Sequence, residues 1–180
     1  MLVLVIIVAV ILLIIVFLYN SLVGNRNKVK NSWGQIDVQL KRRFDLIPNL
    51  VEIVKGYSSH ERSTFEGVTS ARTKYLSSST PEDMMKANGE LTTVLGKLFA
   101  VAEDYPELKS NINYLELQDE LSKTEDKISY ARQFYNDVVM EYNNTVQMFP
   151  SSIVAKLCSF KEESFFNVDE DEKSIPQIKF

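Results

Sequence analysis

Apolar residues recur every three or four positions between Asn27 and Tyr57, which is the pattern of an amphipathic helix. This apolar stripe consists of Val29, Trp33, Ile36, Leu40, Phe44, Ile47, Val51 and Val54. It keeps its phase past Pro48, although a proline removes one donor and collides with the carbonyl four residues earlier. The pattern therefore predicts a helix that continues through a kink at Pro48. It weakens after Gly56, so residues 27–77 form either one long helix or two.

Two further helical stripes follow a clear boundary. Thr80 is a good N-cap, Pro81 suits the first helical position, and Asp83 lies three residues after the cap. One stripe then reaches Tyr105, and the last runs from about residue 106 to 148. Because the connections are short, such helices favour antiparallel neighbours, and the fold class is predicted as an all-α, up-and-down bundle.

The patterns divide the chain into an anchor (1–23), a helical bundle (24–149) and a C-terminal segment (150–180). The C-terminal segment follows neither the helical nor the strand period. It is predicted to be irregular and to dock on the bundle through its aromatic residues, with the acidic run Asp169–Glu172 in solvent.

The run Met1–Leu18 has no polar or charged side chain, and Tyr19 supplies an interfacial ring. Eighteen helical residues rise about 27 Å, close to the hydrocarbon thickness of a bilayer. A cleaved signal peptide would have a basic first region, a shorter apolar core and small residues at a cleavage site. The sequence therefore predicts an uncleaved, single-pass membrane anchor, with the lipid bilayer as a partner.

Charge is distributed unevenly along the chain. The net charge is −4, but residues 24–43 carry six basic side chains against one acid, which leaves −9 on the rest. Basic residues beside the apolar run (Arg26, Lys28 and Lys30) flank the membrane together with Tyr19. The positive-inside rule then places the N-terminus outside and the body in the cytoplasm. The remaining helices carry no basic stripe, so a nucleic-acid partner is not expected.

Catalytic and metal-binding patterns are not found in the sequence. His60 is the single histidine, which excludes a pair of Glu-x-x-His motifs and His-Glu-x-x-His. Cys158 is the single cysteine, and no glycine-rich phosphate loop is present. We expect no enzymatic activity, no cofactor and no metal. The function predicted is a scaffold or interaction module; the alternative is an enzyme or small-ligand carrier that uses a polar cavity in the bundle.

The far side of the first amphipathic helix mixes polar and apolar residues. At about 100° per residue, the positions away from the apolar stripe form a candidate interaction surface. These positions are Gln35, Val38, Gln39, Arg42, Leu46, Asn49 and Ile53. They are consistent with a solvated face that includes an Arg42–Asp45 pair, with a central helix covered on both sides, or with an interface to a partner or another copy. The interface is our hypothesis.

Several motifs resemble the LemA family of bacterial membrane proteins. They are WGQIDVQL at 33–40, RRFDLIPNLV at 42–51, ARQFYN at 131–136, Phe160, Phe165-Phe166 and Pro176–Phe180. One departure is Cys158-Ser159-Phe160, where the family usually has glycine before phenylalanine, so a different turn is expected. The resemblance implies a membrane-anchored helical bundle with its N-terminus outside, its body in the cytoplasm and no established enzymatic activity.

Overall fold

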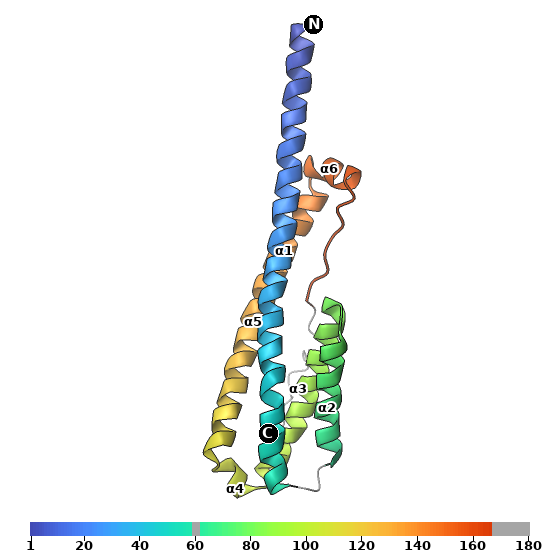
Figure 1. Cartoon of the computed structure of the whole chain (residues 1–180). Coiled ribbons are helices and arrows are strands. Elements are labelled where there is room, and N and C mark those ends of the chain that lie inside the picture. Colours follow the sequence, from blue (N-terminus) through green and yellow to red (C-terminus); the bar gives the residue numbers. More distant parts are fainter. Residues whose placement is uncertain (59–61, 167–180) are drawn as a thin grey trace, which may run out of the picture. The chain divides into compact units, whose positions relative to one another are not determined.

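The structure is a computed structural model that describes residues 1–58 and 62–166. These residues form helices and no strand, which confirms the predicted all-α class. The helices are α1 (Leu2–Tyr57), α2 (Arg62–Ser77), α3 (Pro81–Glu103), α4 (Pro106–Lys109), α5 (Ile112–Gln147) and α6 (Ser151–Leu157) (Figure 1). The predictions made for His60, Asp169–Glu172 and Pro176–Phe180 fall outside the described residues.

Helix α1 is continuous from the apolar run to the end of the apolar stripe. It contains Pro48 without ending there, as predicted, and the kink at Pro48 stays a prediction. Because α1 ends at Tyr57 and α2 begins at Arg62, residues 27–77 contain two helices.

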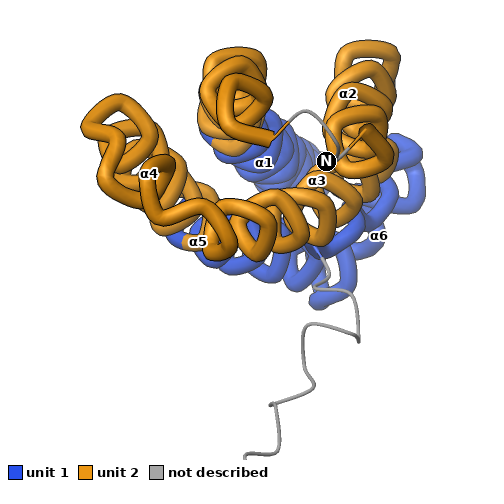
Figure 2. Tube along the Cα trace, turned by 90° about the horizontal axis from the view of Figure 1, so that it is seen from below, with its two compact units in different colours: residues 1–35, 130–166 blue, residues 36–129, 167–180 orange. Residues whose placement is uncertain are grey.

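The described residues form two compact units. Unit 1 consists of residues 1–35 and 130–166, and unit 2 contains residues 36–129 (Figure 2). Helices α1 and α5 each contribute residues to both units.

Unit 2 has a core formed by the predicted apolar stripe. Its α1 residues Ile36, Leu40, Phe44, Ile47, Val51 and Val54 are buried, together with Leu50. The ring of Phe44 stacks on that of Tyr75 from α2 at 4.0 Å between centroids. Full burial of one such side chain contributes roughly 1.5–3 kcal/mol, so this stripe accounts for much of the stability of the unit.

The predicted start of α3 is confirmed. The Thr80 hydroxyl accepts from the Asp83 N–H at 3.2 Å, and Pro81 occupies the first turn. The predicted helix over residues 106–148 is instead divided into α4 and α5. The division arises because the Asn111 side chain accepts from the Tyr114 N–H at 3.2 Å, which caps a new helix.

The segment 150–180 was predicted to be irregular. This prediction is wrong for residues 151–157, which form α6. Helix α6 ends in a Schellman motif, in which Phe160 N–H donates to the Ala155 carbonyl and Ser159 N–H donates to the Lys156 carbonyl. Ser159 has φ of 57°, the left-handed conformation that favours glycine. The serine therefore adopts the left-handed conformation that glycine favours at this position.

Residues 161–166, the C-terminal strap, have no regular secondary structure and run along α5 within unit 1. The Asn143 side chain donates to the Glu163 carbonyl and accepts from the Glu163 N–H, both at 2.9 Å. Asn136 makes the same two bonds to the backbone of Phe166, at 3.1 and 2.8 Å. The strap is thus held largely by side chains that bind its backbone, and not by aromatic contacts alone.

The tyrosine before each of these asparagines also binds the strap backbone. Tyr142 donates to the Lys161 carbonyl at 2.8 Å, and Tyr135 donates to the Ser164 carbonyl at 3.1 Å. Seven helical residues span about 10.5 Å, and three extended residues span about 10 Å. This match lets two Tyr-Asn pairs seven residues apart bind strap positions three residues apart, with the strap antiparallel to α5.

Candidate functional site

The candidate interaction surface on α1 is partly exposed. Val38 is 62% exposed, and Arg42 and Asn49 are also exposed. Gln39, Leu46 and Ile53 are half-buried in unit 2, whereas Gln35 is exposed in unit 1. The apolar members of this face are therefore neither fully in the core nor fully in solvent.

Helix α5 covers part of this surface within unit 2. An open groove of about 460 Å³ is lined by Asn49 and Ile53 of α1 and by α5 residues Asn113, Glu116, Leu117 and Glu120. Arg42 pairs with the half-buried Glu120 of α5. The alternative of a solvated face had instead predicted a pair between Arg42 and Asp45. The groove therefore extends the predicted α1 surface onto a second helix, which the sequence did not indicate.

Arg43, next to this surface in the sequence, is buried and joins three helices. Its Nη1 lies 2.6 Å from Asn88 Oδ1 and 3.1 Å from Thr92 Oγ1 of α3, and 2.9 Å from Glu125 Oε2 of α5. Its side chain is 6% exposed, while that of Glu125 is 46% exposed. A planar guanidinium with several donors suits such a cluster better than a lysine would.

The spacing of apolar residues in the sequence already indicated that Arg43 is buried. The buried positions Ile36, Leu40, Ile47, Leu50 and Val54 alternate in steps of four and three with position 43 between 40 and 47. A charged residue in such a seam needs partners from the facing helices, because an unpaired buried charge is costly. A cleft of about 410 Å³ lies beside the cluster, lined by residues that include Leu95 and Phe99.

Tyr75 shows how burial affects a titratable group here. Burial raises the pKa of Tyr75 well above its usual value, and the hydrogen bond to Asp37 at 3.0 Å and the charges of Asp37 and Asp45 raise it further. The phenol therefore stays protonated at neutral pH and acts as a donor. This is the arrangement of a structural contact between α1 and α2.

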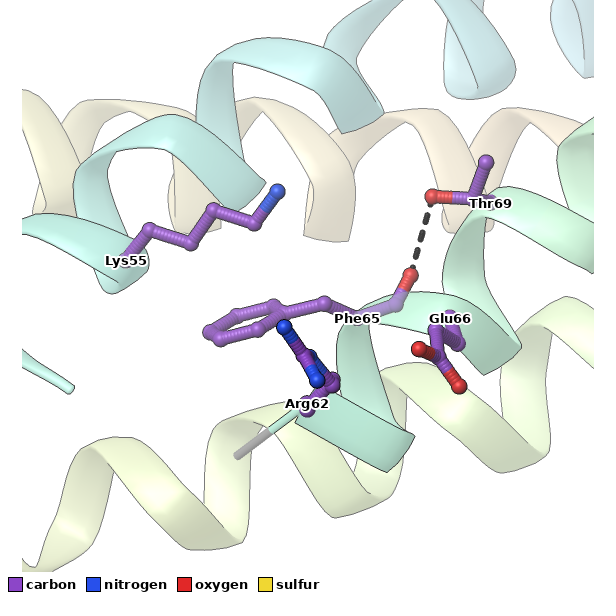
Figure 3. A pocket seen from close by; sticks show the side chains of 5 residues that line it. All are labelled: Lys55, Arg62, Phe65, Glu66 and Thr69. Atoms are coloured by element: carbon purple, nitrogen blue, oxygen red, sulfur yellow. Dashed lines mark hydrogen bonds between the residues drawn. The ribbon is translucent and has the colours of Figure 1, made fainter. Parts of the chain in front are cut away.

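Another open pocket lies between the end of α1 and the start of α2. It has a volume of about 520 Å³ and is lined by Lys55, Arg62, Phe65, Glu66 and Thr69 (Figure 3). The ammonium of Lys55 lies 5.3 Å from the centre of the Phe65 ring. Lys55, Arg62 and Glu66 are all exposed, so the pocket offers solvated charges around one ring and no buried polar group.

The residues predicted to flank the membrane, Tyr19, Arg26, Lys28 and Lys30, lie in unit 1. Tyr19 and Arg26 both contact the ring of Phe160, at 5.8 and 5.0 Å from its centre. Lys28 pairs with Glu141 at 3.1 Å, and Lys30 is exposed. Two of these residues, Tyr19 and Arg26, thus pack on the residue that follows the turn after α6.

Carboxylate and thiol side chains are dispersed over the part of the chain that the structure describes. No group of three or more His, Cys, Asp or Glu side chains gathers there as metal ligands. Cys158 is exposed and unpaired with another cysteine. One described helix, α1, is long and apolar enough to cross a membrane.

Comparison with known proteins gives consistent matches. A model of the LemA family matches residues 32–180. Magnetosome protein MamQ 2 of Paramagnetospirillum magneticum is 26% identical over 174 residues, covering 82% of this chain and 64% of the relative. Protein LemA of Metamycoplasma hominis is 24% identical over 155 residues, covering 86% of this chain and 71% of the relative.

Magnetosome protein MamQ of Magnetospirillum gryphiswaldense is 24% identical over 175 residues. The chain thus spans 64% of the length of these magnetosome relatives. The names of these relatives state no reaction.

Proposed function

The chain belongs to the LemA family, and we propose that it is a membrane-anchored interaction module that binds a helical segment of a partner protein. In this proposal the bundle catalyses no reaction, and the anchor keeps it at the membrane. The observation that carries the proposal is the open groove between α1 and α5. At about 100° per residue, the exposed residues Val38 and Arg42 lie on the same face of α1 as the groove residue Asn49.

The composition of the groove suits a helix better than a small ligand. Ile53 and Leu117 supply apolar contact, while Asn49 and Asn113 supply amide groups that bind side chains or helix ends. An amphipathic helix binds such grooves through apolar residues spaced three and four apart. A small-molecule site is usually more enclosed and more apolar.

The acidic residues of the groove indicate the charge that a partner helix would carry. Glu116 is exposed at the groove, and Glu120 lies beside it, paired with Arg42. A partner helix that places lysine or arginine beside its apolar residues would be complementary to Glu116. Complementary charge of this kind sets orientation and the rate of association more than affinity.

The surface is tested by charge substitution at an exposed residue, so that the fold is retained. Full-length Val38→Asp should lose proteins that copurify with the wild type from native membranes. The matched control is Leu76→Asp on α2, because Leu76 and Val38 are both 62% exposed. If both variants retain the same copurifying proteins, or both lose them, the α1 surface is not the binding site.

Light scattering on a sizing column separates a foreign partner from a second copy. If Val38→Asp reduces the mass of the wild-type particle to that of one chain and Leu76→Asp does not, the surface binds another copy. The proposal of a partner protein would then be replaced by self-association through the same face.

We propose that the body lies in the cytoplasm, because the basic residues Arg26, Lys28 and Lys30 follow the span directly. Tyr130 is 74% exposed on α5 and is a suitable reporter. Tyr130→Cys in a Cys158→Ser background should resist a membrane-impermeant thiol reagent in intact cells and react after lysis. Labelling in intact cells would reverse the orientation.

A further inference from the structure

We infer that α6 and the turn before it form a second membrane contact, in which exposed apolar side chains enter the lipid interface beside the span. The partner is the bilayer itself. The side chains are Met148, Phe149, Ile153 and Leu157, which are 62%, 81%, 52% and 78% exposed. The inference rests on the membrane span and does not depend on the proposed partner protein.

The packing of α6 on α1 determines how far α6 lies from the end of the membrane span. Val154 and Ala155 of α6 are buried against Leu22 of α1, with Leu18 and Phe160 packed against the same cluster. Leu18 is the last residue of the apolar run, and Leu22 is four residues further along α1. Four helical residues span about 6 Å, which is about the thickness of one headgroup layer. Figure 1 shows α6 beside this part of α1.

The exposed side chains of residues 148–157 are unusually apolar for a surface. Ile153 and Leu157 are one helical turn apart and so share a face of α6, whereas the buried Ala155 lies on the opposite face. Single exposed apolar residues are ordinary, but four within ten residues form a patch that favours removal from water. Interfacial helices bury such a face about 5–10 Å into the boundary between headgroups and acyl chains.

Residues around α6 are of the types found at a membrane surface. Tyr19 and Arg26 contact Phe160, which follows the turn that ends α6. Lys156 is exposed on α6 and can reach lipid phosphates. An aromatic ring, a guanidinium and an ammonium next to an apolar patch match the composition of the interfacial layer.

The test uses full-length protein in vesicles of phosphatidylcholine and phosphatidylglycerol, with spin labels on single cysteines. Ile153→Cys and Met140→Cys, each in a Cys158→Ser background, form a matched pair because both residues are 52% exposed. Met140 is next to Glu141, which pairs with Lys28, ten residues after Leu18 on α1. Ten helical residues span about 15 Å, which is beyond the headgroup layer.

The expected result is a several-fold higher ratio of oxygen to nickel-chelate accessibility at position 153 than at position 140, because oxygen concentrates in lipid. A label at Leu12→Cys, inside the span, should give a high ratio in every sample. Equal low ratios at 153 and 140, with a high ratio at 12, would overturn the inference while retaining the span. A low ratio at 12 would overturn both.

A second measurement uses Cys158, which is naturally exposed beside Leu157. A spin label on Cys158 should become more accessible to the nickel chelate in the double variant Ile153→Ser, Leu157→Ser than in the wild type. The control variant Met140→Ser should leave the accessibility of this label unchanged. Strong dipolar coupling between Cys158 labels on two copies, with low accessibility to both reagents, would show that another copy covers the patch and would overturn the lipid contact.

Discussion

The two units hold their parts together by different kinds of contact. In unit 1, Asn136 and Asn143 bind the backbone of the C-terminal strap. In unit 2, Arg43 binds the side chains of Asn88, Thr92 and Glu125. Backbone binding depends on the helix residues and tolerates change of the exposed strap side chains, such as Glu163, whereas a side-chain cluster depends on both partners. The bonds to Glu163 and Ser164 therefore do not depend on the side chains at these strap positions, whereas the Arg43 cluster depends on the side chain of every member.

The largest expected effect is in the unit 2 cluster. Arg43→Met should lower the free energy of unfolding by about 2–3 kcal/mol, because Asn88 is left buried without its donor and Glu125 loses its partner. The matched control is Arg42→Met, whose exposed pair with Glu120 is worth less than about 1 kcal/mol. Denaturant titration of the full-length protein in a mild detergent, followed by circular dichroism, measures both. Equal stability of the two variants would show that the cluster does not hold unit 2 together.

A smaller effect is expected from removing the strap contacts of unit 1. Asn143→Ala should lower the free energy of unfolding by about 1–3 kcal/mol, because both hydrogen bonds to the Glu163 backbone disappear. The Glu163 N–H then has no side-chain acceptor. Hydrogen exchange should show faster exchange at the Glu163 amide.

Substitutions in the strap test whether its own exposed side chains contribute to the stability of unit 1. Glu163→Ala and Ser164→Ala should change stability by less than about 0.5 kcal/mol, because both side chains are exposed and only their backbone atoms are bound. A large loss in either strap variant would contradict backbone recognition and make the two units alike.

A gain in stability, and not a loss, is expected at the turn between α6 and the strap. Ser159→Gly should raise stability by about 1 kcal/mol, because glycine adopts φ of 57° without the cost that a side chain carries. Ser159→Ala should show no gain, since alanine keeps the Cβ. The midpoint of thermal unfolding, compared for the two variants, measures the difference.

The sequence by itself determined the features that depend on local pattern. The steps of three and four that include Ile36, Leu40 and Phe44 predicted a helix and the face that it buries. Thr80, Pro81 and Asp83 predicted a helix start, because capping involves residues three positions apart. The run Met1–Leu18 predicted a span because its length and composition suffice. The family followed from motifs spread along nearly the whole chain.

The tertiary structure decided what depends on partners distant in sequence. Arg42 and Arg43 are adjacent and chemically alike, yet about 100° of helical rotation puts Arg43 among three helices and leaves Arg42 at the surface. The Tyr-Asn pairs at 135–136 and 142–143 are visible in the sequence, but their role needs the strap, about twenty to thirty residues away, to lie antiparallel to α5. The position of α6 beside Leu18 and Leu22 likewise depends on a contact between residues more than 130 positions apart. Local periodicity encodes which face of a helix is apolar, and only the packed chain determines what that face meets.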